Sequence, residues 1–297
     1  MNTLRFDSAD EYSAILRGEK PLEISHEYGG KYCVLIDHYK HKLEKKNEWV
    51  RDFKGERCVV IDGGDKPNYW EPFIGFCTDS PHIYIKDNSY TPTDNPNVRI
   101  GCYRPGDKSI AYLSEHGDLR EERPTDVMFR GDLHFGRNKK AKALTEYCQA
   151  LNENGGLRYD IGKPKYGRNS HLEKMRKAKV VVCFKGKGTR TRRQWEAALC
   201  GAVCLCEKEL ADWWPILSGD AQFDSLKRME IELFDMAFDN RFLRMRREAN
   251  FSLARKCFVD CTVPIHLRMA ALYALYAEPQ MWTYEEVEKA EAKHGLS

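Results

Sequence analysis

The sequence predicts an α/β protein built on parallel sheets, with a helical region at its C-terminal end. Strands and helices alternate between residues 126 and 206 with short connections, as in right-handed crossovers between parallel strands. Two of these strands, 180–184 and 202–206, are uninterrupted apolar runs, which is typical of strands buried on both faces. After residue 222 the pattern indicates helices alone.

The second half of the chain divides readily into elements. Apolar residues spaced three and four apart predict a helix at 138–154. Ser170 followed by Glu173 predicts a capping box at the start of the next helix. Gly201 is expected to end the helix that follows the strand 180–184. Strands are predicted at 126–131, 157–162, 180–184 and 202–206, and the other helices at 171–179, 226–238, 240–259, 264–277 and 285–294.

The first half indicates a smaller Rossmann-like domain. Short strands are predicted at 32–37, 57–62, 82–86 and 98–102, with a helix at 44–53. The polar segment 117–125 ends in Pro-Thr and is the expected interdomain linker. We therefore expect an N-terminal domain at 1–120, a linker at 121–125, a second Rossmann-like domain at 126–260, and closing helices at 261–297 that pack across both domains.

Composition narrows the class of protein. With 42% hydrophobic and 31% charged residues in 297, the chain is expected to be globular rather than disordered or fibrous. No apolar run approaches the ~20 residues that span a bilayer, and the acidic first residues do not resemble a secretory signal. The eleven cysteines are odd in number, and several lie inside apolar runs, so we expect buried free thiols in a cytoplasmic protein, or in the host cytoplasm for a viral one. A zinc site at Cys200, Cys204 and Cys206 is disfavoured because no fourth ligand lies nearby in the sequence.

A glycine-rich turn at 185–189 is the strongest functional signal. Gly186 and Gly188 allow backbone N–H groups to approach a ligand just before a helix begins. Thirteen Lys and Arg lie between residues 158 and 193 against two acids, and this one-sided charge predicts an anionic ligand. The Walker pattern is missing. A dinucleotide site stays open as an alternative, because GKGTRT contains GxGxx and Glu207 ends the following strand, where a ribose-binding acid belongs.

The segment FKGKGTRTRRQWEAALCGAVCLC, residues 184–206, resembles the donor-binding segment of glycosyltransferases with the two-domain GT-B architecture. The resemblance rests on the loop, on Arg193, Trp195, Glu196 and Ala197, and on Gly201 before the returning strand. It implies a nucleotide-sugar donor, with Glu196 on the ribose hydroxyls and the loop with Arg193 on the diphosphate. The weaker likeness of residues 129–144 implies that Arg137 also meets the diphosphate. The donor-site residues expected on these grounds are Arg137, Lys185, Gly186, Gly188, Thr189, Arg190, Arg193 and Glu196.

The resemblance implies a hexosyl- or pentosyltransferase with no bound cofactor or metal, and no DxD motif is present. A UDP-sugar is the expected donor. Asp62 is the favoured general base, because it ends an apolar strand and enters a double-glycine turn; an Asx turn is the competing interpretation. The acceptor is either a hydroxymethylated base in duplex DNA, as for phage DNA glycosyltransferases, or a surface glycan. An NAD-dependent oxidoreductase and a non-catalytic nucleic-acid-binding protein remain alternatives, and the oligomeric state is open.

Overall fold

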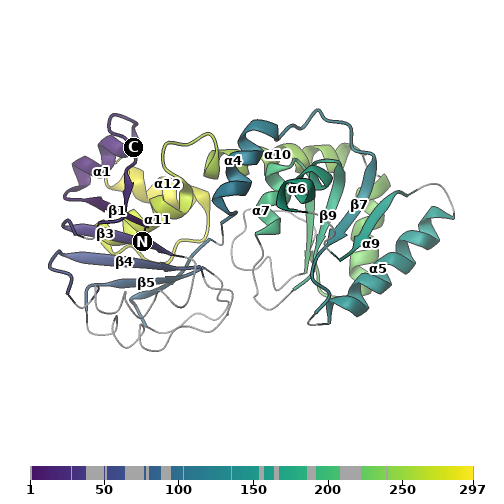
Figure 1. Ribbon diagram of the computed structural model, residues 1–297, viewed down its shortest axis with the longest axis horizontal. Helices are drawn as coiled ribbons and strands as arrows, with labels where there is room; N and C mark the ends of the chain where they lie inside the picture. Colours follow the sequence, from purple (N-terminus) through teal and green to yellow (C-terminus); the bar gives the residue numbers. More distant parts are fainter. Residues whose placement is uncertain are drawn as a thin grey trace. The chain divides into compact units, whose positions relative to one another are not determined.

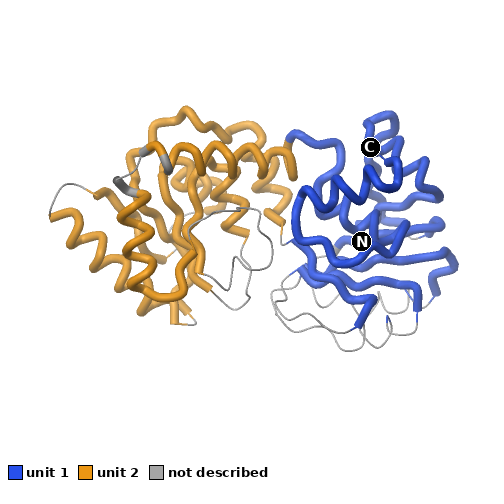
Figure 2. The backbone as a smooth tube through the Cα atoms, turned by 180° about the vertical axis from the view of Figure 1, so that it is seen from behind, with its two compact units in different colours: residues 1–103, 260–297 blue, residues 104–259 orange. Residues whose placement is uncertain are grey.

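The structure is a computed structural model in which two compact units are distinguished (Figure 2). Unit 1 comprises residues 1–103 and 260–297, and unit 2 comprises residues 104–259. The residues described are 2–27, 29–37, 50, 52–63, 77, 80–87, 95–102, 104–134, 136–153, 157–163, 167–185, 192–207, 222–238 and 240–296. Among them, no helix is both long and apolar enough to cross a membrane.

Unit 1 is built on a six-stranded sheet in the order β2-β1-β3-β4-β5-β6 (Figure 1). The strands are β1 (Asn2–Phe6), β2 (Ile24–Ser25), β3 (Tyr32–Asp37), β4 (Arg57–Asp62), β5 (Ile83–Lys86) and β6 (Val98–Ile100). β3 to β6 run parallel to one another, as predicted. β1 is antiparallel to both β2 and β3, and this antiparallel edge was not predicted.

The sheet of unit 1 is buried on both sides, which explains its apolar strands. Cys33, Leu35, Cys58, Val60 and Tyr84 form one core layer. The closing helix α11 (Ile265–Tyr276) contacts β3, β4 and β5. The remaining described helices of the unit are α1 (Ala9–Leu16) and α12 (Tyr284–Lys293).

Unit 2 contains a five-stranded parallel sheet in the order β11-β10-β9-β7-β8 (Figure 1). Its strands are β7 (Thr125–Arg130), β8 (Tyr159–Gly162), β9 (Ala178–Cys183), β10 (Val203–Glu207) and β11 (Gln222–Phe223). Its helices are α4 (Asp107–His116), α5 (Arg137–Asn152), α6 (Arg168–Arg176), α7 (Arg193–Leu199), α9 (Leu226–Phe238) and α10 (Asn240–Phe258). The two sheets with their helices confirm the predicted α/β class.

Alternation along the central strands assigns the side chains of unit 2 to two layers. Val180, Val182, Val203 and Leu205 belong to the core that includes residues of α5 and α9. Since side chains point to opposite faces in turn, Cys183, Cys204 and Cys206 lie on the other face. α6 and α7 both contact β9.

One prediction of local structure was wrong, and one helix of unit 2 was missed. α6 begins at Arg168 after Gly167, which provides no side-chain cap, so Ser170 lies inside the first turn rather than at the cap. The short helix α4 was not predicted at all. The helix expected at 44–53 lies mostly outside the described residues.

The domain boundaries also differ from those expected. The chain divides between residues 103 and 104 rather than at 121–125. The segment expected as a linker is held within unit 2, because buried Arg123 donates hydrogen bonds to the carbonyls of Ala178 (2.7 Å) and Cys200 (2.6 Å). Glu121 pairs with Arg176 of α6 at 2.9 Å. Residues 260–297 group with unit 1.

Candidate donor site

The candidate site lies where the parallel strands of unit 2 end. β7, β8, β9 and β10 run in one direction, so their carboxyl ends share one edge, which is where open α/β sheets bind ligands. A cavity of about 570 Å³ lies at this edge. It is lined by Asp132, Leu133, His134, Asn138 and Lys163, which follow β7 and β8.

Four of the predicted donor-site residues fall within the described part of the chain, and four do not. Gly186, Gly188, Thr189 and Arg190 lie outside the described residues. Arg137, Lys185, Arg193 and Glu196 are described, and all of them belong to unit 2. Their roles toward a donor remain predictions.

Arg137 joins two of the loops at the sheet edge. It is the first residue of α5, and its guanidinium donates hydrogen bonds to the carbonyls of Phe184 and Lys185, both at 3.0 Å. Burial lowers the pKa of Arg137, and the nearby charge of Arg193 lowers it further. Arg137 therefore ties the start of α5 to the end of β9 and places a positive charge beside Arg193.

Glu207 is the acid that a dinucleotide site would need at the end of β10. One of its carboxylate oxygens accepts the backbone N–H of Lys185 at 2.6 Å. The other pairs with Lys140 of α5. Glu207 thus holds the beginning of the glycine-rich turn in place, and both of its oxygens have protein partners.

Arg193 begins α7 and reaches toward the end of β7. Its guanidinium lies over the ring of Phe129, with Cζ 6.0 Å from the ring centroid. A Cβ added to Gly131 would lie 3.0 Å from its Nη1 atom. The missing side chain at Gly131 therefore provides the space that the Arg193 guanidinium occupies.

Glu196 lies one turn further along α7 and is buried, with 9% of its surface exposed. Its Oε1 atom accepts a hydrogen bond from the Ser109 hydroxyl on α4 at 2.7 Å. As residues three apart on a helix, Arg193 and Glu196 project from the same side. A buried carboxylate without a hydrogen-bond partner would destabilise the fold by roughly 1–3 kcal/mol or more. The hydrogen bond from Ser109 therefore both stabilises and orients the Glu196 side chain.

His171 belongs to the same site and was missed from the sequence. It lies half-buried on α6. Burial lowers its pKa, the positive charge of Arg193 lowers it further, and the negative charge of Glu196 acts in the opposite direction. His171 is therefore within electrostatic reach of both residues that carry the donor-site hypothesis. Nothing in the sequence connected residue 171 to them, because their proximity arises from the packing of α6 against α7.

Asp62, the predicted general base, ends β4 in unit 1 and has only 5% of its surface exposed. Its Oδ2 atom accepts hydrogen bonds from Tyr84 and from Lys86, the latter at 2.8 Å. These partners lie on the neighbouring strand β5. Asp62 is thus part of a buried ion pair. Residue 64, which an Asx turn would involve, lies outside the described residues, and the role of Asp62 as a base remains a prediction.

No family model matches the chain, and no curated protein matches it. Several solved structures are similar to it. T4 phage BGT with UDP and Mn²⁺ is 10% identical, with a TM-score of 0.37, over 67% of this chain and 69% of that one. The pneumococcal O-GlcNAc transferase GtfA with UDP and GlcNAc is 12% identical, with a TM-score of 0.43, over 88% of this chain and 65% of that one.

A third similar structure is the DNA-modifying enzyme beta-glucosyltransferase, which is 10% identical with a TM-score of 0.41, over 87% of this chain and 78% of that one. All three are glycosyltransferases, the class that residues 184–206 resemble.

Proposed function

We propose that the chain is a glycosyltransferase that binds a nucleotide-sugar, with a UDP-sugar as the expected donor, at the carboxyl edge of the unit 2 sheet. The observation that carries this proposal is the placement of Arg193 and buried Glu196 on one side of α7. A guanidinium can hold a phosphate through two parallel hydrogen bonds. A carboxylate one turn away, oriented by Ser109, suits the adjacent hydroxyls of a ribose.

The chemistry needs positive charge where the diphosphate departs. As the glycosidic bond to the diphosphate breaks, negative charge develops on the leaving oxygen, and fixed cations stabilise it. The positive charge of Arg193 acts on the guanidinium of Arg137 and lowers its pKa. Such repulsion is relieved when an anion binds between them. The acceptor oxygen then bonds to the sugar carbon and loses its proton to a base, for which Asp62 is the candidate.

The dinucleotide alternative is disfavoured by Glu207. In a site for NAD the acid at the end of the second strand is available to the ribose. Here its two oxygens are used by Lys140 and by the backbone of Lys185. Tight NAD(H) binding without any binding of nucleotide-sugars would overturn the proposal.

Two acceptors remain under this proposal, a hydroxymethylated base in duplex DNA and a surface glycan. The excess of basic residues in 158–193 would suit DNA phosphates. We expect turnover without added metal, so assays with EDTA and with Mn²⁺ should give equal rates. Binding of DNA that depends on salt and is unaffected by Glu196→Ala, with no transfer to any acceptor, would instead favour a non-catalytic nucleic-acid-binding protein.

The test is a thermal-shift screen against UDP-, GDP-, CMP- and TDP-sugars, because a ligand of the native state raises its Tm. With the ligand found, Glu196→Ala and Arg193→Ala should each lower kcat/KM by roughly 10- to 100-fold, since each removes a charge-assisted hydrogen bond. Ser109→Ala, which leaves Glu196 but removes its partner, should have a smaller effect.

Matched controls are Arg244→Ala and Glu248→Ala, which remove an exposed ion pair of α10. Exposed pairs contribute little, so both variants should keep full activity. Full turnover in Glu196→Ala or Arg193→Ala, with the fold intact by circular dichroism, would show that the donor site lies elsewhere.

A further inference from the structure

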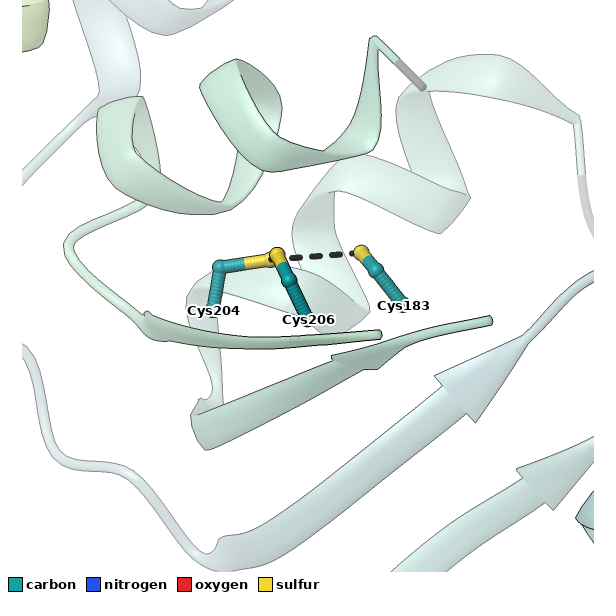
Figure 3. Close-up of side chains that lie close together, drawn as sticks. All are labelled: Cys183, Cys204 and Cys206. Carbon is teal, nitrogen blue, oxygen red and sulfur yellow. Dashed lines mark hydrogen bonds between the residues drawn. The ribbon is translucent and has the colours of Figure 1, made fainter. Parts of the chain in front are cut away.

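Three cysteines of unit 2 meet in the layer between the sheet and α7 (Figure 3). Cys183 ends β9, and Cys204 and Cys206 lie two residues apart on β10. The register pairs Cys206 directly with Cys183, so all three side chains point to one face. The sequence singled out Cys200 as the partner of the β10 pair, but Cys200 instead faces the carbonyl of Leu172 at 3.7 Å.

The three sulfur atoms lie close together and away from solvent. Sγ of Cys204 is 3.2 Å from that of Cys183 and 3.3 Å from that of Cys206. All three sulfurs lie within 4.8 Å of one another, and each residue is at most 1% exposed. Among the described residues, this is the one group of three or more Cys, His, Asp or Glu side chains whose possible metal-ligand atoms lie close together.

We propose that Cys183, Cys204 and Cys206 bind one thiophilic cation, Cu(I) in preference to Zn(II). Metal–sulfur bonds of about 2.3 Å separate the sulfurs of a three-coordinate ion by roughly 4.0 Å. The sulfurs therefore need to move apart by about 0.8 Å from their closest approach to reach that spacing.

The number of ligands decides between the two ions. Structural zinc takes four protein ligands, and no fourth Cys, His, Asp or Glu of the described chain belongs to the group. Soft thiolates favour Cu(I), which accepts three of them. The amide of Gln194, on the first turn of α7, donates to Cys206 Sγ at 3.2 Å and closes the fourth side.

Charge at the site supports the same ion. Three thiolates around one monovalent cation leave two negative charges, which are costly to bury without compensation. The guanidinium charges of Arg193 and Arg137 both act on Cys183. They supply two positive charges beside the cluster, and binding of the ion releases the three thiol protons to solvent.

The ion would connect β9, β10 and the first turn of α7. These elements flank the glycine-rich turn, but the proposal does not depend on the proposed function, because metal uptake is measured without nucleotide. Reduced protein is titrated with Cu(I) in the presence of the competing chelator bicinchoninate, which suppresses weak binding by the other cysteines.

Wild type and the matched control Cys200→Ser, which alters a buried cysteine of the same unit outside the group, should each take up one tight equivalent. Cys183→Ser, Cys204→Ser and Cys206→Ser should lose it. Equal uptake by Cys183→Ser and Cys200→Ser would overturn the proposal, as would Zn(II) displacing Cu(I) from the wild-type protein.

A second measurement needs no variant and so does not depend on the substituted proteins folding. Wild type with and without Cu(I) is alkylated in mild urea, and the labelled cysteines are mapped by mass spectrometry. Cu(I) should protect Cys183, Cys204 and Cys206 together and leave Cys200 unchanged. Protection of other cysteines, or of none, would also refute the site.

Discussion

At the scale of single residues, His171 provides a proton-linked readout of the donor site. Burial and the charge of Arg193 lower its pKa, so the imidazole is neutral at pH 7. A diphosphate bound beside Arg193 adds negative charge, which raises the pKa of His171. Binding then takes up a proton, and affinity must increase as the pH falls through the pKa of the complex toward the pKa of the free protein.

We therefore expect a UDP-sugar to bind more tightly at pH 5.5 than at pH 7.5, by up to about tenfold for each unit by which the pKa rises. The diester phosphates of a UDP-sugar do not titrate in this range, so the change reports on the protein. Isothermal titration calorimetry at several pH values measures it. His171→Asn should flatten the profile, whereas His116→Asn, at an exposed position on α4, should leave it unchanged; a flat wild-type profile would contradict the placement of the diphosphate.

At the scale of elements, the end of α7 depends on a left-handed glycine. Gly201 has φ +70°, and its N–H donates to the carbonyl of Ala198 at 2.8 Å. The sequence predicted this end correctly, because glycine is the residue that adopts this conformation without a steric penalty. It did not predict that Arg123 lies against Gly201, since the contact spans 78 positions of the chain.

Gly201→Ala should destabilise unit 2 by about 2 kcal/mol. An alanine at this position is strained, because its backbone must keep the positive φ. Its Cβ would also lie 2.7 Å from Nη2 of Arg123, and Arg123 would then have to move away from the carbonyl of Cys200. Gly136→Ala is the matched control, because Gly136 has φ +78° but no atom within 4 Å of the added Cβ. Urea unfolding should show the larger loss for Gly201→Ala, and equal losses would mean that Arg123 contributes nothing at this position.

The difference between local sequence signals and contacts that are distant in the sequence explains which elements and which site contacts were predictable. β9 and β10 were predicted because burial on both faces makes their sequences continuously apolar. α4 was missed because only Ser109 and Leu113 of it are buried, and Gly106 at its start offers no side-chain cap. Arg193 and Glu196 could be selected from local spacing, whereas Ser109 reaches Glu196 from 87 residues away.

At the scale of the whole molecule, unit 1 is assembled from both ends of the chain, as the blue segments of Figure 2 show. The closing helices were expected to pack across both domains, and residues 260–297 group with unit 1 through contacts that span more than 200 residues. Arg57 of β4 donates to the carbonyl of Ala274 at 2.6 Å across 217 positions. Ser13 of α1 similarly donates to the carbonyl of Leu296 at 2.9 Å.

A chain that ends at residue 259 should therefore lose the fold of unit 1 while unit 2 stays folded. All residues of α11 from Ile265 to Ala274 are buried, and removing them exposes the apolar face of β3, β4 and β5. At about 25 cal/mol per Å² of apolar surface, every ~400 Å² newly exposed costs about 10 kcal/mol, which is comparable to the 5–15 kcal/mol that typically stabilises a folded protein.

Hydrogen exchange followed by mass spectrometry distinguishes the units in one experiment. Peptides from β3 and β4 should exchange rapidly in the truncated chain, and peptides from β7 and β9 should keep their protection. A chain ending at residue 277 is the control, because it retains α11 and loses α12 with Glu291, the buried partner of Arg268, together with Leu296, the acceptor of Ser13. It should keep β3 and β4 protected but unfold at a lower temperature, and if the shorter chain also kept them protected, α11 would not be part of the unit 1 core.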